Sequence, residues 1–247
     1  MSFPIAIAIC MAAIQTPAAK VDRSGEPALK SLLEWSSKQK RLAGTILRTY
    51  REGGRAVAYP DGIIQFWMDG DNTRVEFSDM WGTSCRVVVT KDKTLEDPGS
   101  DPVMIRKSGA TIVESSSLLE SKGTAASPWY YLRQGPQLLD KMDKDNSIKL
   151  IDDHTILWDS SLFGDLTIEF ESTPQGNRPK SFAFNNIHWQ TDMYKQFPEW
   201  FDEPNPTAQW KQVIIFGPFQ GRNLFSLEAG RGRTSIDSTK PTPPPLN

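Results

Sequence analysis

Cysteine and histidine are scarce in this sequence, since its 247 residues include only two of each. Cys10 lies in an apolar N-terminal run, and Cys85 lies in 84–89, a run typical of a β-strand. Removal of the N-terminal run would leave Cys85 alone, so we expect no disulfide within the chain and a half-buried thiol rather than a nucleophile. Because zinc-site spacing is absent as well, we expect no metal and no other cofactor.

The chain also has no excess of basic residues. It carries 28 Lys and Arg against 30 Asp and Glu, which gives a net charge of −2 and a pI near 5.8. Nucleic-acid-binding proteins usually present a basic field to the phosphates, whereas the cations here are scattered among carboxylates. We therefore predict no nucleic-acid partner.

Long hydrophobic runs are missing too. The apolar run from Phe3 to Ile14 is shorter than the roughly 20 residues that a bilayer-spanning helix needs, so we predict no transmembrane span. Small residues follow it, and the segment resembles a secretory signal over 1–19 with cleavage near Ala18 or Ala19, although no Lys or Arg precedes the run. We expect a periplasmic or otherwise exported protein, with one domain over 20–237 and a Pro-rich flexible tail over 238–247.

Catalytic motifs are absent from the sequence. It has no phosphate-binding loop, no dinucleotide-binding glycine pattern and no serine-hydrolase elbow. Asp152, Asp153 and His154 are adjacent, so their side chains diverge, and we interpret them as a solvated turn. His188 has no partner at ligand spacing. We predict that the protein is not an enzyme; a hydrolytic role for His154 or His188 is the weakest of three hypotheses.

Aromatic residues, by contrast, are plentiful, with eight Trp and twelve Phe. The most informative stretch is Gly62–Phe77, GIIQFWMDGDNTRVEF, in which two apolar runs flank Asp69-Gly70-Asp71-Asn72. Asp-Gly and Asn suit a tight reversal, so the stretch predicts a β-hairpin. Its first strand is apolar at both alternating sets of positions, which predicts apolar contacts on both faces of the sheet.

Other segments predict one long helix, many strands and a broken helical segment. The helix is expected over Glu26–Arg41, and the helical segment over Ser127–Met142 is expected in two pieces because Gly135-Pro136 interrupts it. Turns are predicted at Pro60-Asp61-Gly62 and Asp152-Asp153. Strands are predicted over Leu42–Glu52, Arg86–Thr90, Val103–Arg106, Ser147–Ile151, Thr155–Trp158, Asp165–Glu171, Ser181–Asn185, Gln209–Phe219 and Asn223–Leu227.

This order of elements resembles the LolA-like lipoprotein-carrier family and its uncharacterised bacterial relatives. In that family a strand with Gly and Trp precedes a turn and an Arg-x-Glu strand, as Gly62–Phe77 does here. Thr94-Leu95 followed by Asp97-Pro98, and the hairpin over 153–184, are similar to later parts of the family. The resemblance extends over Glu26–Asn185.

The resemblance implies an α+β fold in which a strongly curved antiparallel half-barrel sheet wraps round a few helices and an apolar cavity. The implied cavity-lining residues come from the hairpin and the helical segment: Ile64, Phe66, Trp67, Met68, Trp129, Tyr130 and Tyr131. The known carriers have an Arg-Pro step after the Trp strand, and that Arg helps to hold a helical lid. Gly70-Asp71 stands there instead, so the lid contact does not transfer to this chain.

The leading hypothesis is an exported, non-enzymatic carrier or sensor that binds an acyl chain or a lipoprotein in the cavity. The alternative is a protein-interaction module of a cell-envelope regulator or assembly, with an envelope protein as partner and no bound lipid. Co-purifying lipid separates the two, because only the carrier should contain it.

Overall fold

The computed structural model describes most of the chain between Val21 and Thr239. The described residues are 21–51, 59–79, 84–100, 102–109, 128–133, 135–141, 146–160, 163–185, 209–221, 223–229 and 232–239. Predictions for the signal segment, for the aromatic stretch 188–201 and for nearly all of the Pro-rich tail fall outside them. No helix within the described ranges has the length and apolar character to cross a bilayer.

The first helix begins where the sequence predicts it but ends three residues earlier, and the first hairpin forms as predicted. Helix α1 spans Glu26–Lys38 and has a Pro in its first turn and Lys38 in its last, as the capping pattern requires. Strands β1 (Arg41–Arg51), β2 (Tyr59–Asp69) and β3 (Asn72–Asp79) follow. Asp69 pairs with Asn72, which leaves a two-residue loop in which Gly70 has φ +58°. A positive φ is easy for glycine, and the predicted Asp-Gly turn is confirmed.

The remaining elements complete a mostly β fold with a few helices. The predicted helical segment forms two short helices, which Gly135-Pro136 separates as expected. The elements after β3 are β4 (Ser84–Val89), β5 (Lys93–Asp97), β6 (Val103–Lys107), α3 (Pro128–Leu132), α4 (Gln137–Lys141), β7 (Ile148–Asp152), β8 (Thr155–Ser160), β9 (Gly164–Thr173), β10 (Gly176–Phe184), β11 (Gln209–Gly217) and β12 (Ser235–Asp237). The sequence patterns did not predict β5 and β12.

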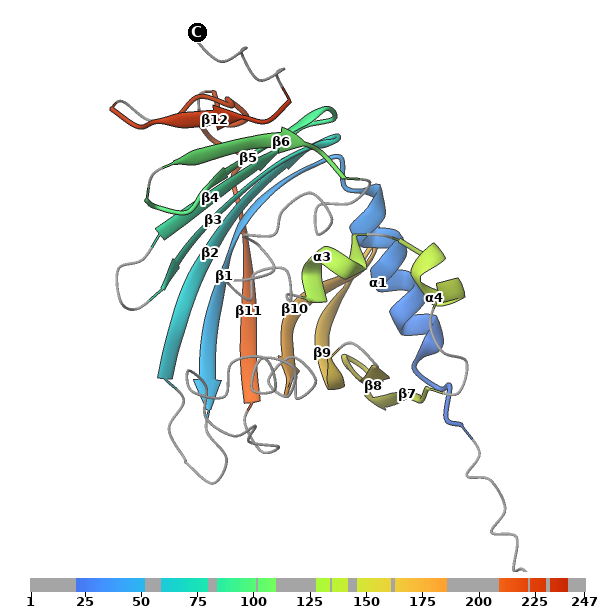
Figure 1. Ribbon diagram of the computed structural model, residues 1–247. Coiled ribbons are helices and arrows are strands. Elements are labelled where there is room, and N and C mark those ends of the chain that lie inside the picture. The colour runs from blue at the N-terminus through green and yellow to red at the C-terminus, as the bar shows by residue number, and fades with distance from the viewer. Residues whose placement is uncertain are drawn as a thin grey trace, which may run out of the picture.

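The twelve strands within the described ranges belong to one sheet, in the order β12-β6-β5-β4-β3-β2-β1-β11-β10-β9-β8-β7 (Figure 1). Every neighbouring pair is antiparallel except β12 and β6, which run parallel. Strand β1 lies between β2 and β11, so it joins the meander β1–β6 to the later meander β7–β11. The predicted antiparallel sheet is confirmed, and the two halves of the chain meet at β1.

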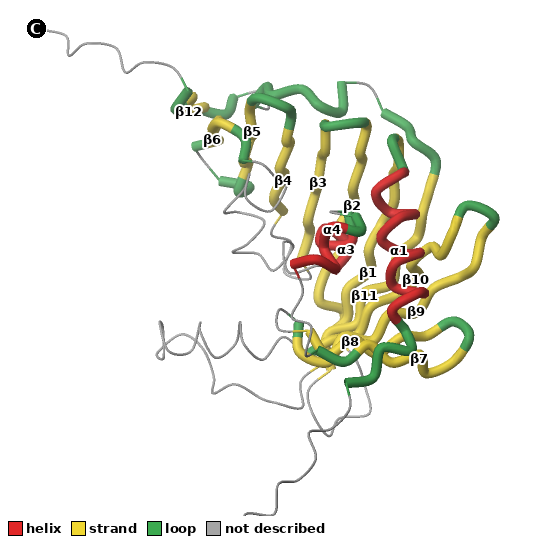
Figure 2. The backbone as a smooth tube through the Cα atoms, turned by 90° about the vertical axis from the view of Figure 1, so that its right-hand side faces the viewer, coloured by secondary structure: helices red, strands yellow, loops and turns green. Residues whose placement is uncertain are grey.

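The helices lie against one face of this sheet, called the helix face below (Figure 2). On α1, Leu29, Leu32, Leu33 and Trp35 are buried against the sheet at helical spacing. They join one large apolar core with inward residues of β1–β4 and β7–β11. The opposite face is called the outer face.

Two predicted local structures are wrong. Pro60-Asp61-Gly62 does not reverse the chain but lies inside β2, because the register shifts between Arg48 and Thr49. Arg48 pairs with Gly62 and Thr49 with Pro60, so Asp61 is the extra residue of a β-bulge. A bulge accepts turn-forming residues without ending the strand.

The predicted strand over Asn223–Leu227 is the second error. Residues 223–229 have no strand pairing, and Asn223 adopts φ +54°. Phe225, Leu227 and Ala229 instead pack on a small second core formed by Val88, Leu95 and Val103. The apolar residues are buried as a strand would bury them, but they belong to an irregular segment that lies on the outer face of β4–β6.

Candidate ligand-binding face

Strand β2 directs alternate side chains to opposite faces of the sheet. Ile64 and Phe66 are fully buried on the helix face, and Met68 is 2 % exposed there. Ile63 lies on the outer face and is 47 % exposed. The sequence predicts buried side chains on both faces of β2. At these positions the side chains are buried on the helix face but not on the outer face.

Four aromatic rings meet above the centre of the helix face, and we call Trp35, Phe66, Trp129 and Phe216 the aromatic cluster. The Trp129 ring lies 5.7 Å from Phe66, 5.6 Å from Phe216 and 6.4 Å from Trp35, measured between centroids. These tilted and edge-on arrangements are the favourable ones for aromatic pairs. The cluster joins α1, α3, β2 and β11, which come from distant parts of the sequence.

Gly44 makes room for this cluster. It pairs with Phe66 on one side and with Phe216 on the other. A Cβ at this position would lie 2.7 Å from Cζ of Phe66. Because Gly44 has no side chain, the Phe66 ring of β2 can lie across β1 at this position.

Helix α3 is anchored to α1 by Arg133, the residue that follows α3. Its Nη1 donates to the backbone carbonyl of Gln39 at 2.8 Å and also to that of Ser36. Burial lowers the pKa of Arg133 from its ordinary value. A cation at the carbonyl end of α1 is favourable for the helix dipole, and it fixes α3 above the cluster.

The structure brings together Ile64, Phe66, Met68 and Trp129 from the residues predicted to line a cavity. All four belong to the same buried core. Tyr130 and Tyr131 lie in the backbone of α3, but their side chains are outside the described residues. Trp35 and Phe216 were not predicted to belong to the site, although both follow the apolar periodicity of their own elements.

Trp67 lies on the other face of the sheet from Phe66, because neighbouring residues of a strand point in opposite directions. The Arg74 guanidinium lies 5.7 Å from its ring centroid. Arg74 also pairs with Glu76 and donates to the Leu224 carbonyl at 3.1 Å. Trp67 thus belongs with the contacts that hold residues 223–229.

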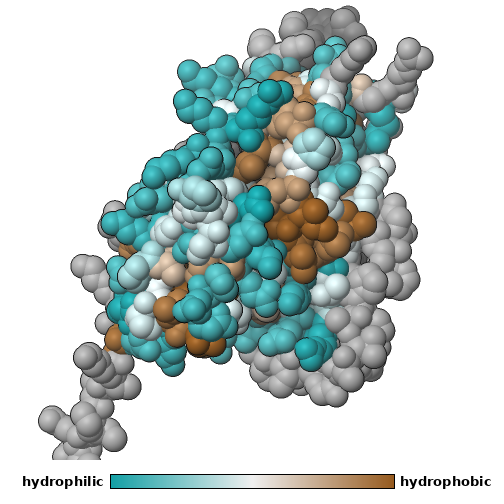
Figure 3. Space-filling model, turned by 180° about the vertical axis from the view of Figure 1, so that it is seen from behind, coloured by the Kyte–Doolittle hydropathy of each residue, from teal (hydrophilic) through white to brown (hydrophobic). Residues whose placement is uncertain are grey.

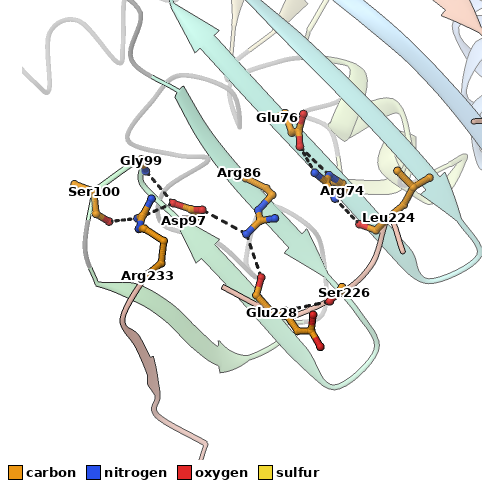
Figure 4. Close-up of polar contacts among 10 residues, drawn as sticks. All are labelled: Arg74, Glu76, Arg86, Asp97, Gly99, Ser100, Leu224, Ser226, Glu228 and Arg233. Carbon is orange, nitrogen blue, oxygen red and sulfur yellow. Dashed lines mark hydrogen bonds and ion pairs between the residues drawn. The ribbon is translucent and has the colours of Figure 1, made fainter. Parts of the chain in front are cut away.

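We call residues 223–229 the strap, and arginines attach it to the outer face (Figure 4). Besides Arg74, Arg86 donates to the carbonyl of Glu228 at 3.2 Å and contacts Asp97 at 3.4 Å. Asp97 also accepts from Arg233 at 3.1 Å. These ion pairs are partly buried, and they join the strap and Arg233, which lies two residues before β12, to the edge of the sheet.

The predicted solvated turn at 152–154 is confirmed. Asp152, Asp153 and His154 are exposed at the β7–β8 hairpin. The His154 backbone N–H donates to Asp152 Oδ1 at 2.8 Å, and this bond is the main reason why the pKa of Asp152 is lowered. Within the described ranges no three His, Cys, Asp or Glu side chains are grouped as a metal site would require. His188 lies outside those ranges.

Among the solved structures that are similar to this chain are two bacterial proteins. No protein-family model and no curated protein match the sequence. The chain is similar to a DUF1329 family protein from Desulfovibrio piger, with 8 % identity over 77 % of this chain and 90 % of that chain and a TM-score of 0.34. It is also similar to a LolA superfamily protein from Nitrosomonas europaea, with 8 % identity over 78 % of this chain and 91 % of that chain and a TM-score of 0.29. The second family is the one that the sequence resembles.

Proposed function

We propose that the protein is an exported, non-enzymatic carrier or sensor that binds an acyl chain on the helix face. In this proposal residues 20–237 act as one domain, and the sheet is a curved half-barrel that wraps round the helices. The bend of the strands around α1 and α3 in Figure 1 supports this shape. The ligand is a free acyl chain or the acyl part of a lipoprotein.

The observation that carries the proposal is the position of Trp129. This residue belongs to a helix of only five residues, yet its large side chain is fully buried on rings from two strands. A short helix has little intrinsic stability, so α3 keeps its place through tertiary contacts, among them those of this ring, of the buried Leu132 and of Arg133. Displacement of α3 would open an apolar site bounded by Ile64, Phe66 and Met68.

The magnitudes are compatible with such an exchange. Burial of a Trp side chain of about 200 Å² is worth about 5 kcal/mol. An acyl chain of about sixteen carbons gains about 12 kcal/mol on full burial, at about 0.8 kcal/mol per CH₂. The free energy gained by burying the acyl chain can therefore offset the free energy lost when Trp129 is displaced, and part of the cost of association.

Binding of the fluorescent apolar probe N-phenyl-1-naphthylamine to the full chain tests the proposal. Phe66→Leu should weaken binding about fivefold or more, because it removes part of the apolar surface under Trp129. Trp67→Leu is the matched control, since it removes an aromatic ring from the same strand but from the outer face. Equal affinities in both variants and the wild type would contradict a site on the helix face.

The alternative is an interaction module that binds an envelope protein and no lipid. Exposed apolar side chains on three neighbouring central strands favour it: Leu47, Ile63, Val213 and Ile215. Seen from behind, the molecule also presents hydrophobic side chains gathered amid hydrophilic ones (Figure 3). Native mass spectrometry distinguishes the two functions, because a carrier purified from cells should retain lipid mass and an interaction module should not.

A further inference from the structure

Two polar side-chain atoms in the core under α3 have no hydrogen-bond partner within the described part of the chain. They are the indole Nε1 of Trp129 and the hydroxyl Oγ of Ser36. Both residues are 0 % exposed. Buried polar groups are nearly always paired, because a group that loses its bond to water without a replacement is destabilising. An unpaired donor beside a proposed binding site suggests that the ligand supplies the acceptor.

Both atoms belong to residues at the junction of α1 and α3. The Arg133 backbone N–H donates to the Trp129 carbonyl at 3.3 Å, and its guanidinium donates to the Ser36 carbonyl. Trp35, which precedes Ser36, contacts Trp129 within the aromatic cluster. The junction therefore combines an apolar floor with two neutral hydrogen-bonding groups at its border.

The chemistry of the Trp129 N–H and the Ser36 hydroxyl determines which kind of ligand atom can bind to them. An indole N–H only donates, so its partner must be an acceptor. The Arg133 guanidinium also contacts this junction, but its Nη1 already donates to two carbonyls at the end of α1. A neutral carbonyl oxygen suits two neutral donors, because it brings no charge that must be desolvated.

We propose that Trp129 Nε1 donates a hydrogen bond to the carbonyl oxygen of an ester-linked or amide-linked acyl chain, with Ser36 Oγ as a second donor. The inference rests on the proposed function and adds the class of ligand. It makes the protein selective for acyl groups over alkyl groups of equal length. The apolar part of the acyl chain then takes the place of the Trp129 ring beside Phe66, and the displaced indole remains within reach of the carbonyl end of that chain.

A matched pair of lipids tests this selectivity. Monopalmitoylglycerol and 1-O-hexadecylglycerol share chain length and headgroup but differ in the carbonyl. Their affinities are measured by displacement of N-phenyl-1-naphthylamine, which has no carbonyl. We expect the wild type to bind the ester about five- to tenfold more tightly than the ether, as one neutral hydrogen bond predicts.

Three variants locate the donor. Trp129→Phe removes the N–H, and replacement of Trp129 by 3-benzothienylalanine keeps the two-ring shape with sulfur in place of N–H. Trp158→Phe is the matched control, because the Trp158 Nε1 is also buried and unpaired but lies on β8. Circular dichroism of each variant verifies folding.

The proposal requires that both Trp129 replacements lower the preference for the ester severalfold while Trp158→Phe retains it in full. A wild type without preference, or a preference that is undiminished in the benzothienyl variant, would overturn the assignment of Trp129. In those cases binding of N-phenyl-1-naphthylamine would still support the proposed function. Failure of the wild type to bind the probe and both lipids would instead overturn the proposed function, and this inference with it.

Discussion

The substitution Gly44→Ala tests the packing on which the candidate site depends. A Cβ at Gly44 would lie 2.7 Å from Cζ of Phe66 and 2.7 Å from the backbone oxygen of Ile215. Ordinary carbon contacts lie at about 3.5–4.0 Å, so both neighbours would have to shift by about 1 Å. The Phe66 ring packs on Trp129 and Phe216, and the Ile215 oxygen belongs to β11.

The expected loss follows from two opposing terms. Overpacking of this kind costs about 1–3 kcal/mol, and the lower entropy of the unfolded Ala chain returns about 0.4–1 kcal/mol. We expect Gly44→Ala to lower the free energy of unfolding by about 1–2 kcal/mol. Gly217→Ala is the control, because a Cβ at Gly217 meets nothing within 4 Å, and it should change stability by less than about 0.5 kcal/mol.

Urea denaturation of the full chain measures both changes. With an unchanged slope, the midpoint of Gly44→Ala should fall by about 0.5 M relative to the wild type. In a Phe66→Leu background, Gly44→Ala should cost less than it does in the wild type, since the smaller side chain relieves one of the two clashes. If Gly44→Ala were as stable as Gly217→Ala, the Phe66 ring would not lie across Gly44 and the geometry of the aromatic cluster would be wrong.

Three further substitutions test the contacts around the sheet. Arg133→Met leaves two carbonyls at the end of α1 without their donor and should cost about 1–3 kcal/mol in urea denaturation; an unchanged midpoint would show that Arg133 does not anchor α3. Asp97→Asn weakens two arginine contacts and should speed proteolysis within the strap, whereas an unaltered cleavage rate would contradict the role of Asp97. In the folded state the Thr239 hydroxyl, assisted by Lys93, lowers the pKa of Asp237 to about 2, so its carboxylate stabilises the fold above about pH 4. The wild type should therefore unfold at a higher temperature than Asp237→Asn at pH 4, and this difference should vanish as the pH falls toward 2. A difference that stays constant over that range would refute the role of the Asp237 carboxylate.

Local residue patterns predicted the elements that local forces determine. Asp69-Gly70 marked the hairpin, Gly135-Pro136 marked the break between α3 and α4, and the apolar spacing on α1 marked its buried side. The bulge at Asp61 was not predictable in this way, because it depends on the register with β1. A turn-forming triplet inside a paired strand has the same composition as a true reversal.

The candidate site was predicted only in part, for a related reason. Alternation along β2 identified Phe66 and its inward neighbours, but no local signal connects them with Trp35 or Phe216. Those contacts arise because β1 pairs with β11, which lies more than 150 residues later in the chain. The strap was misread because Phe225 and Leu227 alternate as a strand does, while their partners are side chains of the outer face rather than a neighbouring backbone.

The attachment of α3 differs from the lid contact of the carriers that the sequence resembles. In those carriers an Arg after the Trp strand helps to hold the helical lid, whereas the corresponding turn here contains Gly70, whose N–H donates to the Lys40 carbonyl at 2.8 Å. The cation is on the helical side instead, where Arg133 binds the carbonyls of Ser36 and Gln39. Residues 36–40 thus receive hydrogen bonds from both the β2–β3 turn and α3. Because these bonds end on backbone carbonyls of α1 and the residues just after it, a ligand that displaces Trp129 can leave the Arg133 contacts in place. If the protein is the proposed carrier, we expect its ligand to rotate α3 about the Arg133 end rather than to release the helix.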